Sequence, residues 1–248
     1  MSNLIALTLR ELKALWYSPI AYVVGALFLF LQGLVFGMLL AVLNDPRVDP
    51  SVTMAQTFFG QTFLYWMAVL ITTPLLTMRT FSEEKRTGTF EVLMTAPVTE
   101  THVVLSKFLG AWIAYSLLWT CTLALFVILR FHTTFDWAPV FTGYLGAILL
   151  GAVFIALGTF ASSLTRNQVI AALLCFVSLL VLFSMGLLDS FVRDPETSKI
   201  IQYLSVIEHS RDFSKGILDT RPVVFYLTLT SIFLFLTGRI ITSPRWRS

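Results

Sequence analysis

The 248-residue chain is too apolar for a soluble globular domain, because 56% of its residues are hydrophobic and 12% are charged, against about 25% charged in soluble domains. Its apolar residues form continuous blocks long enough to cross a membrane as helices, and continuous rather than alternating hydrophobicity excludes a membrane β-barrel. The net charge of +3 is interpreted as membrane orientation, and no nucleic-acid partner is expected.

Residues 3–16 precede the first apolar block and predict an interfacial helix. Four apolar residues recur at helical spacing on one face: Ile5, Leu9, Leu12 and Trp16. Such a helix lies on the membrane surface. A cleaved signal peptide is the alternative, but the apolar run that follows is too long and lacks a small-residue cleavage site, so no cleavage is expected.

The apolar blocks predict six transmembrane helices, and the fold class is therefore an all-α integral membrane protein in which residues 1–248 form a single transmembrane domain. The predicted spans cover residues 20–43, 57–78, 103–129, 139–162, 169–188 and 223–241. Each span satisfies its backbone groups internally, as a helix in lipid must.

Small residues spaced by four mark two of these spans. Gly143, Ala147 and Gly151 form such a stripe in the fourth span, and Gly33 and Gly37 repeat the pattern in the first. These stripes let another helix approach closely. Packing within the subunit and packing between two subunits both remain open.

The densest run of charge, RTFSEEKRTGTFEVLMTAPVT at residues 79–99, lies between the second and third spans. Ser82 suits a helix N-cap, with acidic residues in the first turn and basic residues towards the end. Gly88 is placed to end this short helix. A second short helix is expected to begin at Thr89 and to close at Pro97. A solvated loop and a docking element for a soluble partner are the two interpretations.

Lys and Arg residues, counted on alternate sides of the spans, predict a cytoplasmic N-terminus. In that orientation ten basic and five acidic residues lie inside. Only Arg47 and Arg130 are basic residues outside once the long segment 189–222 is set aside. Both termini and residues 79–99 are thus predicted to be cytoplasmic. Segment 189–222 is too apolar for a simple solvated loop, so we expect short helices at the outer membrane edge.

Residues that carry chemistry are sparse. Cys121 and Cys175 fall in apolar blocks and are interpreted as packing residues. The three histidines, His102, His132 and His209, form no cluster, so no metal site is expected. The sequence contains no G-x-x-x-x-G-K-[ST] phosphate loop, and the chain is not expected to be an ATPase by itself.

Three function classes can be weighed against the residues of the spans. An ion-coupled secondary transporter normally needs an ionisable residue within a span, and none lies near a predicted midplane. A membrane-embedded enzyme needs a nucleophile with a base or a metal, whereas Ser162, Ser163 and Ser178 have no evident partner and are expected to bond to neighbouring helices. A membrane scaffold without transport remains a further alternative.

Two stretches and one lysine resemble the ABC-2 type permease family, and most closely its branch of gliding-motility-type permeases. They are PLLTMRTFSEEKRTGTFEVLMTAPVT at residues 74–99, Lys107, and FSKGILDTR at residues 213–221. The resemblance implies an exporter of type V architecture in the bacterial inner membrane. Its expected partners are a separate ABC ATPase subunit, which binds ATP and magnesium, a second permease subunit that is a copy or a different chain, and membrane lipid.

The resemblance also implies a coupling helix at about residues 80–95 that contacts the ATPase subunit. The residues expected there are Arg79, Phe81, Glu83, Glu84, Arg86, Phe90, Glu91 and Leu93, with the phenylalanines and Leu93 as apolar anchors. Segment 189–222 would form gate-like outer helices, with Phe213, Gly216 and Asp219 as its site residues. Two permease subunits would meet through the first and fifth spans. The cargo is not indicated by the residues.

Overall fold

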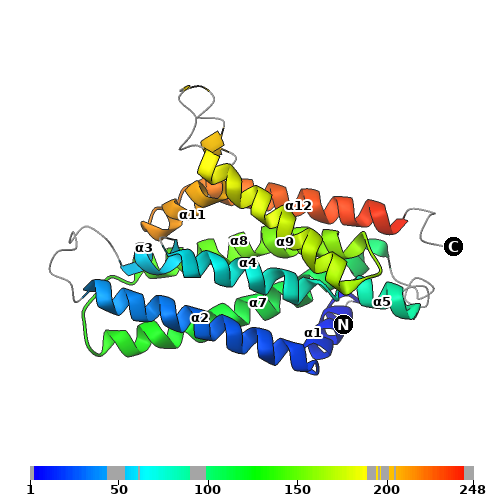
Figure 1. The fold of residues 1–248 in the computed structure, drawn as a ribbon, viewed down its shortest axis with the longest axis horizontal. Coiled ribbons are helices and arrows are strands. Elements are labelled where there is room, and N and C mark those ends of the chain that lie inside the picture. The colour runs from blue at the N-terminus through cyan, green and yellow to red at the C-terminus, as the bar shows by residue number, and fades with distance from the viewer. Residues whose placement is uncertain are drawn as a thin grey trace.

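The computed structural model describes residues 3–43, 54–60, 62–89, 99–188, 194, 196, 201–203 and 205–242. Long helices lie side by side along one axis (Figure 1). They are α2 (Pro19–Leu43), α4 (Phe63–Thr77), α7 (Glu100–Arg130), α8 (Ala138–Ser163), α9 (Gln168–Leu188) and α12 (Thr220–Thr242). Shorter helices lie at the ends: α1 (Asn3–Trp16), α3 (Met54–Phe59), α5 (Ser82–Thr87) and α11 (Val206–Ser214). The described chain is thus all-helical, as predicted.

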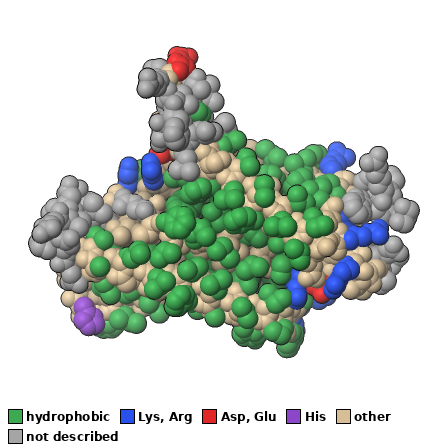
Figure 2. All heavy atoms as spheres, in the orientation of Figure 1, with side chains coloured by type: hydrophobic (Ala, Val, Ile, Leu, Met, Phe, Trp, Pro, Cys, Tyr) green, Lys and Arg blue, Asp and Glu red, His purple; other side chains and the backbone are tan. Residues whose placement is uncertain are grey.

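Five of the six predicted spans are single helices long and apolar enough to cross a membrane among the residues described: α2, α7, α8, α9 and α12. Their surface fits a lipid environment, because hydrophobic side chains cover the middle of the face in Figure 2 and charged side chains lie towards the ends. Helix α1, α5 and the end of α12 lie at one end of the bundle (Figure 1). The chain is therefore a multi-pass membrane protein.

The second predicted span, 57–78, is divided into two helices. Helix α3 ends at Phe59 and α4 begins at Phe63, and α4 has 15 residues, about 22 Å, short of the ~30 Å of hydrocarbon. Two side-chain hydrogen bonds connect the two sides of this break. Thr62 Oγ1 donates to the Thr57 carbonyl at 3.2 Å, and Trp66 Nε1 donates to the Gly60 carbonyl at 3.3 Å. Gly60, a weak helix former, lies at this point.

Helix α8 is the centre of the bundle. It packs against α3, α4, α7, α9, α11 and α12, and most of its length is buried. Glycines permit these contacts: a β-carbon at Gly143 would lie 2.4 Å from the Phe59 ring, and one at Gly151 would lie 2.1 Å from the Tyr115 ring. The stripe in the fourth span therefore packs within the subunit. A β-carbon at Gly33 or Gly37 of α2 would meet no atom within 4 Å, and both glycines are exposed.

Trp119 of α7 ties several helices together from a fully buried position. Its ring centroid lies 5.2 Å from that of Phe28 on α2 and 5.9 Å from that of Phe59 on α3. It also lies 5.7 Å from Tyr65 on α4 and 6.1 Å from Tyr144 on α8. Such aromatic pairs stabilise beyond the area that they bury, so this residue fixes where α2, α4 and α8 meet.

We expect Gly151→Ala to destabilise the chain, because its new methyl group overlaps the Tyr115 ring; overpacking of this kind costs about 1–3 kcal/mol. The matched control is Gly37→Ala in α2, where space is open and alanine is the better helix former. Thermal unfolding in detergent measures both. A Gly151→Ala melting temperature equal to or above that of Gly37→Ala would contradict this packing of α8 against α7.

Candidate functional site

The charged segment after α4 forms an elbow, defined here as residues 78–89. Its short helix α5 spans Ser82–Thr87 and ends at Gly88, whose φ of 73° is left-handed, as predicted for a C-terminal glycine. The predicted N-cap is wrong by one residue. Phe81 occupies the cap position without a side-chain cap bond, and the Ser82 hydroxyl instead donates to the Met78 carbonyl.

The missing cap is supplied by Ser162, at the end of α8. Its hydroxyl oxygen accepts from the backbone N–H of Phe81 at 3.1 Å and of Ser82 at 3.2 Å. The same hydroxyl donates to the Met78 carbonyl at 3.1 Å. The first amides of a helix lack partners within it, so this one side chain satisfies two of them. The expectation of a bond to a neighbouring helix is confirmed for Ser162, whereas the Ser163 hydroxyl donates to Phe160 of its own helix.

Lys85 makes a second attachment between the elbow and α8. Its ammonium group donates to the carbonyl of Ser163, where a cation is favoured because it faces the C-terminal end of a helix. Lys85 is buried, and this burial lowers its pKa to about 8, with a further contribution from the nearby charge of Arg166. The elbow thus has two polar contacts with the last turn of α8.

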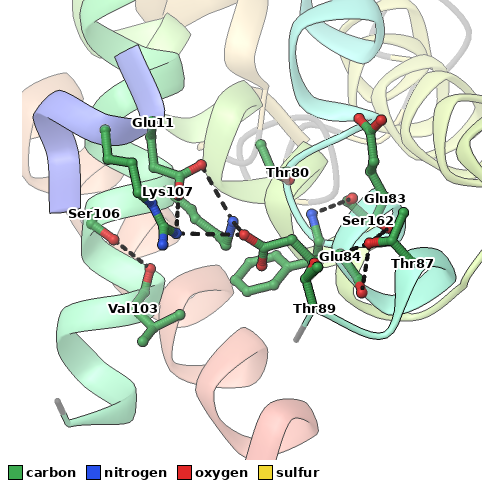
Figure 3. Close-up of polar contacts among 12 residues, drawn as sticks. Glu11, Thr80, Glu83, Glu84, Thr87, Thr89, Val103, Ser106, Lys107 and Ser162 are labelled. Atoms are coloured by element: carbon green, nitrogen blue, oxygen red, sulfur yellow. Dashed lines mark hydrogen bonds and ion pairs between the residues drawn. The ribbon is translucent and has the colours of Figure 1, made fainter. Parts of the chain in front are cut away.

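A buried ion cluster joins the elbow to α7 and α1 (Figure 3). The side chain of Lys107 on α7 is 1% exposed, and its Nζ lies 2.8 Å from Glu84 Oε1 and 3.3 Å from Glu11 Oε2. The same Nζ lies 5.3 Å from the centre of the Phe81 ring. A buried charge is tolerated only when it is paired. The two carboxylates and the ring meet that need.

Two arginines extend the cluster. Arg10 Nη2 lies 2.7 Å from Glu11 Oε1 and 3.5 Å from Glu84 Oε1. Arg79 Nη1 donates to Ser18 Oγ at 3.1 Å, just before α2 begins, and its Nε lies 3.8 Å from Glu83 Oε2. Helix α1 is therefore connected to the elbow through charged side chains, a link that no local pattern in the sequence predicts.

The predicted coupling residues divide into three groups. Phe81 and Glu84 contact other parts of the same chain, Glu84 through its ion pair with Lys107. Phe81 is fully buried beside Val103, Val104 and Ile241. It is therefore not a surface anchor and instead holds the elbow to α7 and α12. Arg86 is exposed, Glu83 is partly exposed, and Arg79 is partly exposed while bonding to Ser18. The remaining predicted coupling residues, Phe90, Glu91 and Leu93, lie outside the residues that the structure describes.

The predicted gate residues lie in α11 and in the segment between α11 and the start of α12, and α11 lies far from α5 in Figure 1. Phe213 is buried against α8, where a β-carbon at Gly146 would lie 2.7 Å from it. Gly216 has a φ of 84° and follows α11. Asp219 accepts a hydrogen bond from the Arg221 amide at 3.1 Å, at the N-terminal end of α12. Their gating role stays a prediction.

The polar contacts around the elbow join it to the neighbouring helices. Among the described residues, no three His, Cys, Asp or Glu side chains could hold a metal ion. Cys121 and Cys175 are both free thiols. What the elbow provides is a short helix whose inner side is fixed to α1, α7 and α8 and whose outer side, at Arg86, Thr87 and Gly88, is exposed.

We expect Ser162→Ala to loosen the elbow, since two buried amides lose their acceptor at a cost of about 1–3 kcal/mol. Hydrogen exchange at the Phe81 and Ser82 amides should accelerate. The control is Ser163→Ala, whose hydroxyl donates only to Phe160 of its own helix. Unchanged exchange at both amides in Ser162→Ala would show that α8 does not hold the elbow.

Comparison with known proteins completes the assignment. Residues 44–207 match the family model described as ABC-2 family transporter protein, which is more than half of the 248-residue chain. The match includes α4, the elbow, α7, α8 and α9. No curated protein matches the chain. The chain therefore belongs to the ABC-2 transporter family and is a permease subunit of an ABC transporter.

Proposed function

We propose that this subunit works in an exporter of the bacterial inner membrane and that a separate ABC ATPase docks on the elbow. Membership of an ABC transporter family implies association with such an ATPase. The observation that carries the docking site is the division of the elbow into a fixed inner side and an exposed outer side. ATP and magnesium would be bound by the ATPase, which supplies the hydrolysis.

The burial of the inner side argues against a merely solvated loop. Phe81 is 0% exposed, and the side chain of Lys107, which pairs with the elbow, is 1% exposed. A solvated loop does not bury an aromatic ring and pair a buried ammonium group. The elbow is therefore held as a defined shape, as an element that transmits force must be.

Helix α8 offers a route from the elbow to the far end of the bundle. Its last turn holds the elbow through Ser162 and Ser163. Its first half contacts Phe213 at Gly146. A displacement of the elbow by a docked ATPase would move α8, and α8 would carry the movement to α11. This route supports the proposed gate-like role of segment 189–222.

A second permease subunit, identical or different, completes the proposed transporter together with surrounding lipid. The first and fifth spans are α2 and α9, and both carry large exposed apolar side chains, among them Leu34, Met38, Leu173 and Val177. These faces are free for a partner subunit or for lipid. The gliding-motility-type branch rests on the resemblance of residues 74–99 and 213–221, and no nucleic-acid partner is proposed.

We expect Arg86→Glu to weaken ATPase binding by about tenfold or more, because a reversed charge at a docked surface opposes the charges that complement it. Arg86 is chosen because it is exposed, whereas reversal of Glu84 would break its pair with Lys107 within the chain. The measurement is a pull-down of an ABC ATPase that co-purifies with the tagged chain, with ATP hydrolysis of the complex.

The control for this experiment is Arg130→Glu, an exposed reversal at the opposite end of α7. It should bind the ATPase as the parent does. If Arg86→Glu and the parent chain retain equal amounts of ATPase and support equal ATP hydrolysis, the elbow is not the docking site.

The basic excess of the inner loops predicts that the elbow faces the cytoplasm. In a chain with Cys121 and Cys175 replaced, a membrane-impermeant thiol reagent applied to intact cells should label Ile217→Cys and not Gly88→Cys. Both positions are exposed. Gly88 directly follows α5 and Ile217 follows α11, and these two helices lie well apart in Figure 1. Labelling of Gly88→Cys alone would reverse the orientation.

A further inference from the structure

A groove of ≈ 310 Å³ lies between the first turns of α7 and the last turns of α12. The walls of the groove further from these helix ends are apolar, and they include Val104 and Leu105 of α7 and Leu234 and Phe235 of α12. Its polar residues belong to the first turn of α7 and the last turn of α12: Glu100, Thr101, Arg239 and Thr242. The groove therefore changes from apolar to polar where two membrane-spanning helices end, as the membrane does between hydrocarbon and headgroups.

The groove is open at Gly238, and it adjoins an apolar surface. A β-carbon at Gly238 would meet no atom within 4 Å, so a side chain at this position would occupy the groove. Phe235 lines the groove and is exposed, as are Ile232 and Leu236 of the same helix. The exposed apolar side chains of a spanning helix contact hydrocarbon. The groove thus opens towards the acyl chains of the membrane.

Arg239 places an accessible cation at the polar end of the groove. Its side chain is exposed, and its guanidinium carbon lies 5.0 Å from the centre of the Phe235 ring, a contact that holds the cation beside the groove. Within the described part of the chain, its guanidinium group has no ion pair and no hydrogen bond. The groove also contains the carboxylate of Glu100, in the first turn of α7, where the positive end of the helix dipole offsets its charge.

We propose that this groove binds an anionic phospholipid, with the phosphate at Arg239 and an acyl chain along the apolar walls. The guanidinium group donates its N–H groups to phosphate oxygens, a pairing that suits its planar shape. A choline lipid carries its own cation beside the phosphate and so compensates less of the charge of Arg239. The site therefore favours phosphatidylglycerol over phosphatidylcholine.

This site goes beyond the proposed docking of an ATPase, because its ligand is a membrane component and the exposed outer side of the elbow is not part of the groove. Val104 lies in the groove wall and also in the buried cluster that includes Phe81 of the elbow. An acyl chain in the groove therefore packs against the cluster that holds the elbow to α7 and α12.

The test uses the full-length chain, purified and delipidated in detergent, and titrated with phosphatidylglycerol or phosphatidylcholine of identical acyl chains. Bound lipid is counted by native mass spectrometry. We expect phosphatidylglycerol to bind about fivefold more tightly, the effect of one arginine beside an anionic lipid. Equal binding of the two lipids, as expected if the groove takes a partner helix or only detergent, would overturn the proposal, and so would a preference for phosphatidylcholine.

Two variants with matched controls locate the phosphate and the acyl chain. Arg239→Gln should bind both lipids equally, whereas Arg221→Gln, an exposed change in the first turn of the same helix, should keep the preference. Gly238→Leu fills the groove and should abolish the preference, whereas Gly37→Leu, which also has open space around it, should keep it. A preference that survives Arg239→Gln or Gly238→Leu places the lipid elsewhere and contradicts the proposal.

A last arm separates the lipid from its headgroup. Soluble glycerol phosphate should bind far more weakly than phosphatidylglycerol, because it cannot use the apolar walls. Equal binding of the two would show that the walls are not used and would also contradict the proposal. None of these measurements involves the ATPase, so their outcome is independent of the docking proposal.

Discussion

The ammonium group of Lys107 cannot remain unpaired where it lies, and this constraint organises one end of the molecule. Its side chain is 1% exposed, and an uncompensated buried charge is strongly destabilising. The pairing carboxylates come from α1 and from the elbow, Glu11 and Glu84. Three segments far apart in the sequence must therefore be in place together. The amphipathic helix α1, through Glu11, is therefore part of what holds the elbow in place.

The elbow also depends on α8 for the start of its own helix. In most helices a local serine, threonine or aspartate supplies the N-terminal acceptor; here Ser162 supplies it from the central helix of the bundle. The elbow helix therefore depends on the end of α8 for part of its stability. Arg86 and Gly88, on the other side of this short helix, remain exposed.

The sequence predicted the helical class, the positions of five spans and the end of the elbow helix at Gly88, because apolar length and glycine are local signals. The register of the elbow's N-terminus could not be predicted, since Ser82 has the right chemistry and Ser162 is distant in the chain. The burial of Phe81 was missed because a short charged segment gives too few residues for a helical periodicity. The pairing of Lys107 with Glu11 has no local signal at all.

The glycines of α8 also limit how the sequence of this protein can diverge. On the outward faces of α2 and α9, one apolar side chain can replace another without meeting a neighbour in the same subunit. At Gly143, Gly151 and Gly158, any side chain meets a ring or a threonine on another helix. A relative that acquires a larger residue there must shrink Phe59, Tyr115 or Thr77 in turn. Across relatives, substitutions at these glycines are therefore expected to occur together with a change in the facing residue of the same subunit.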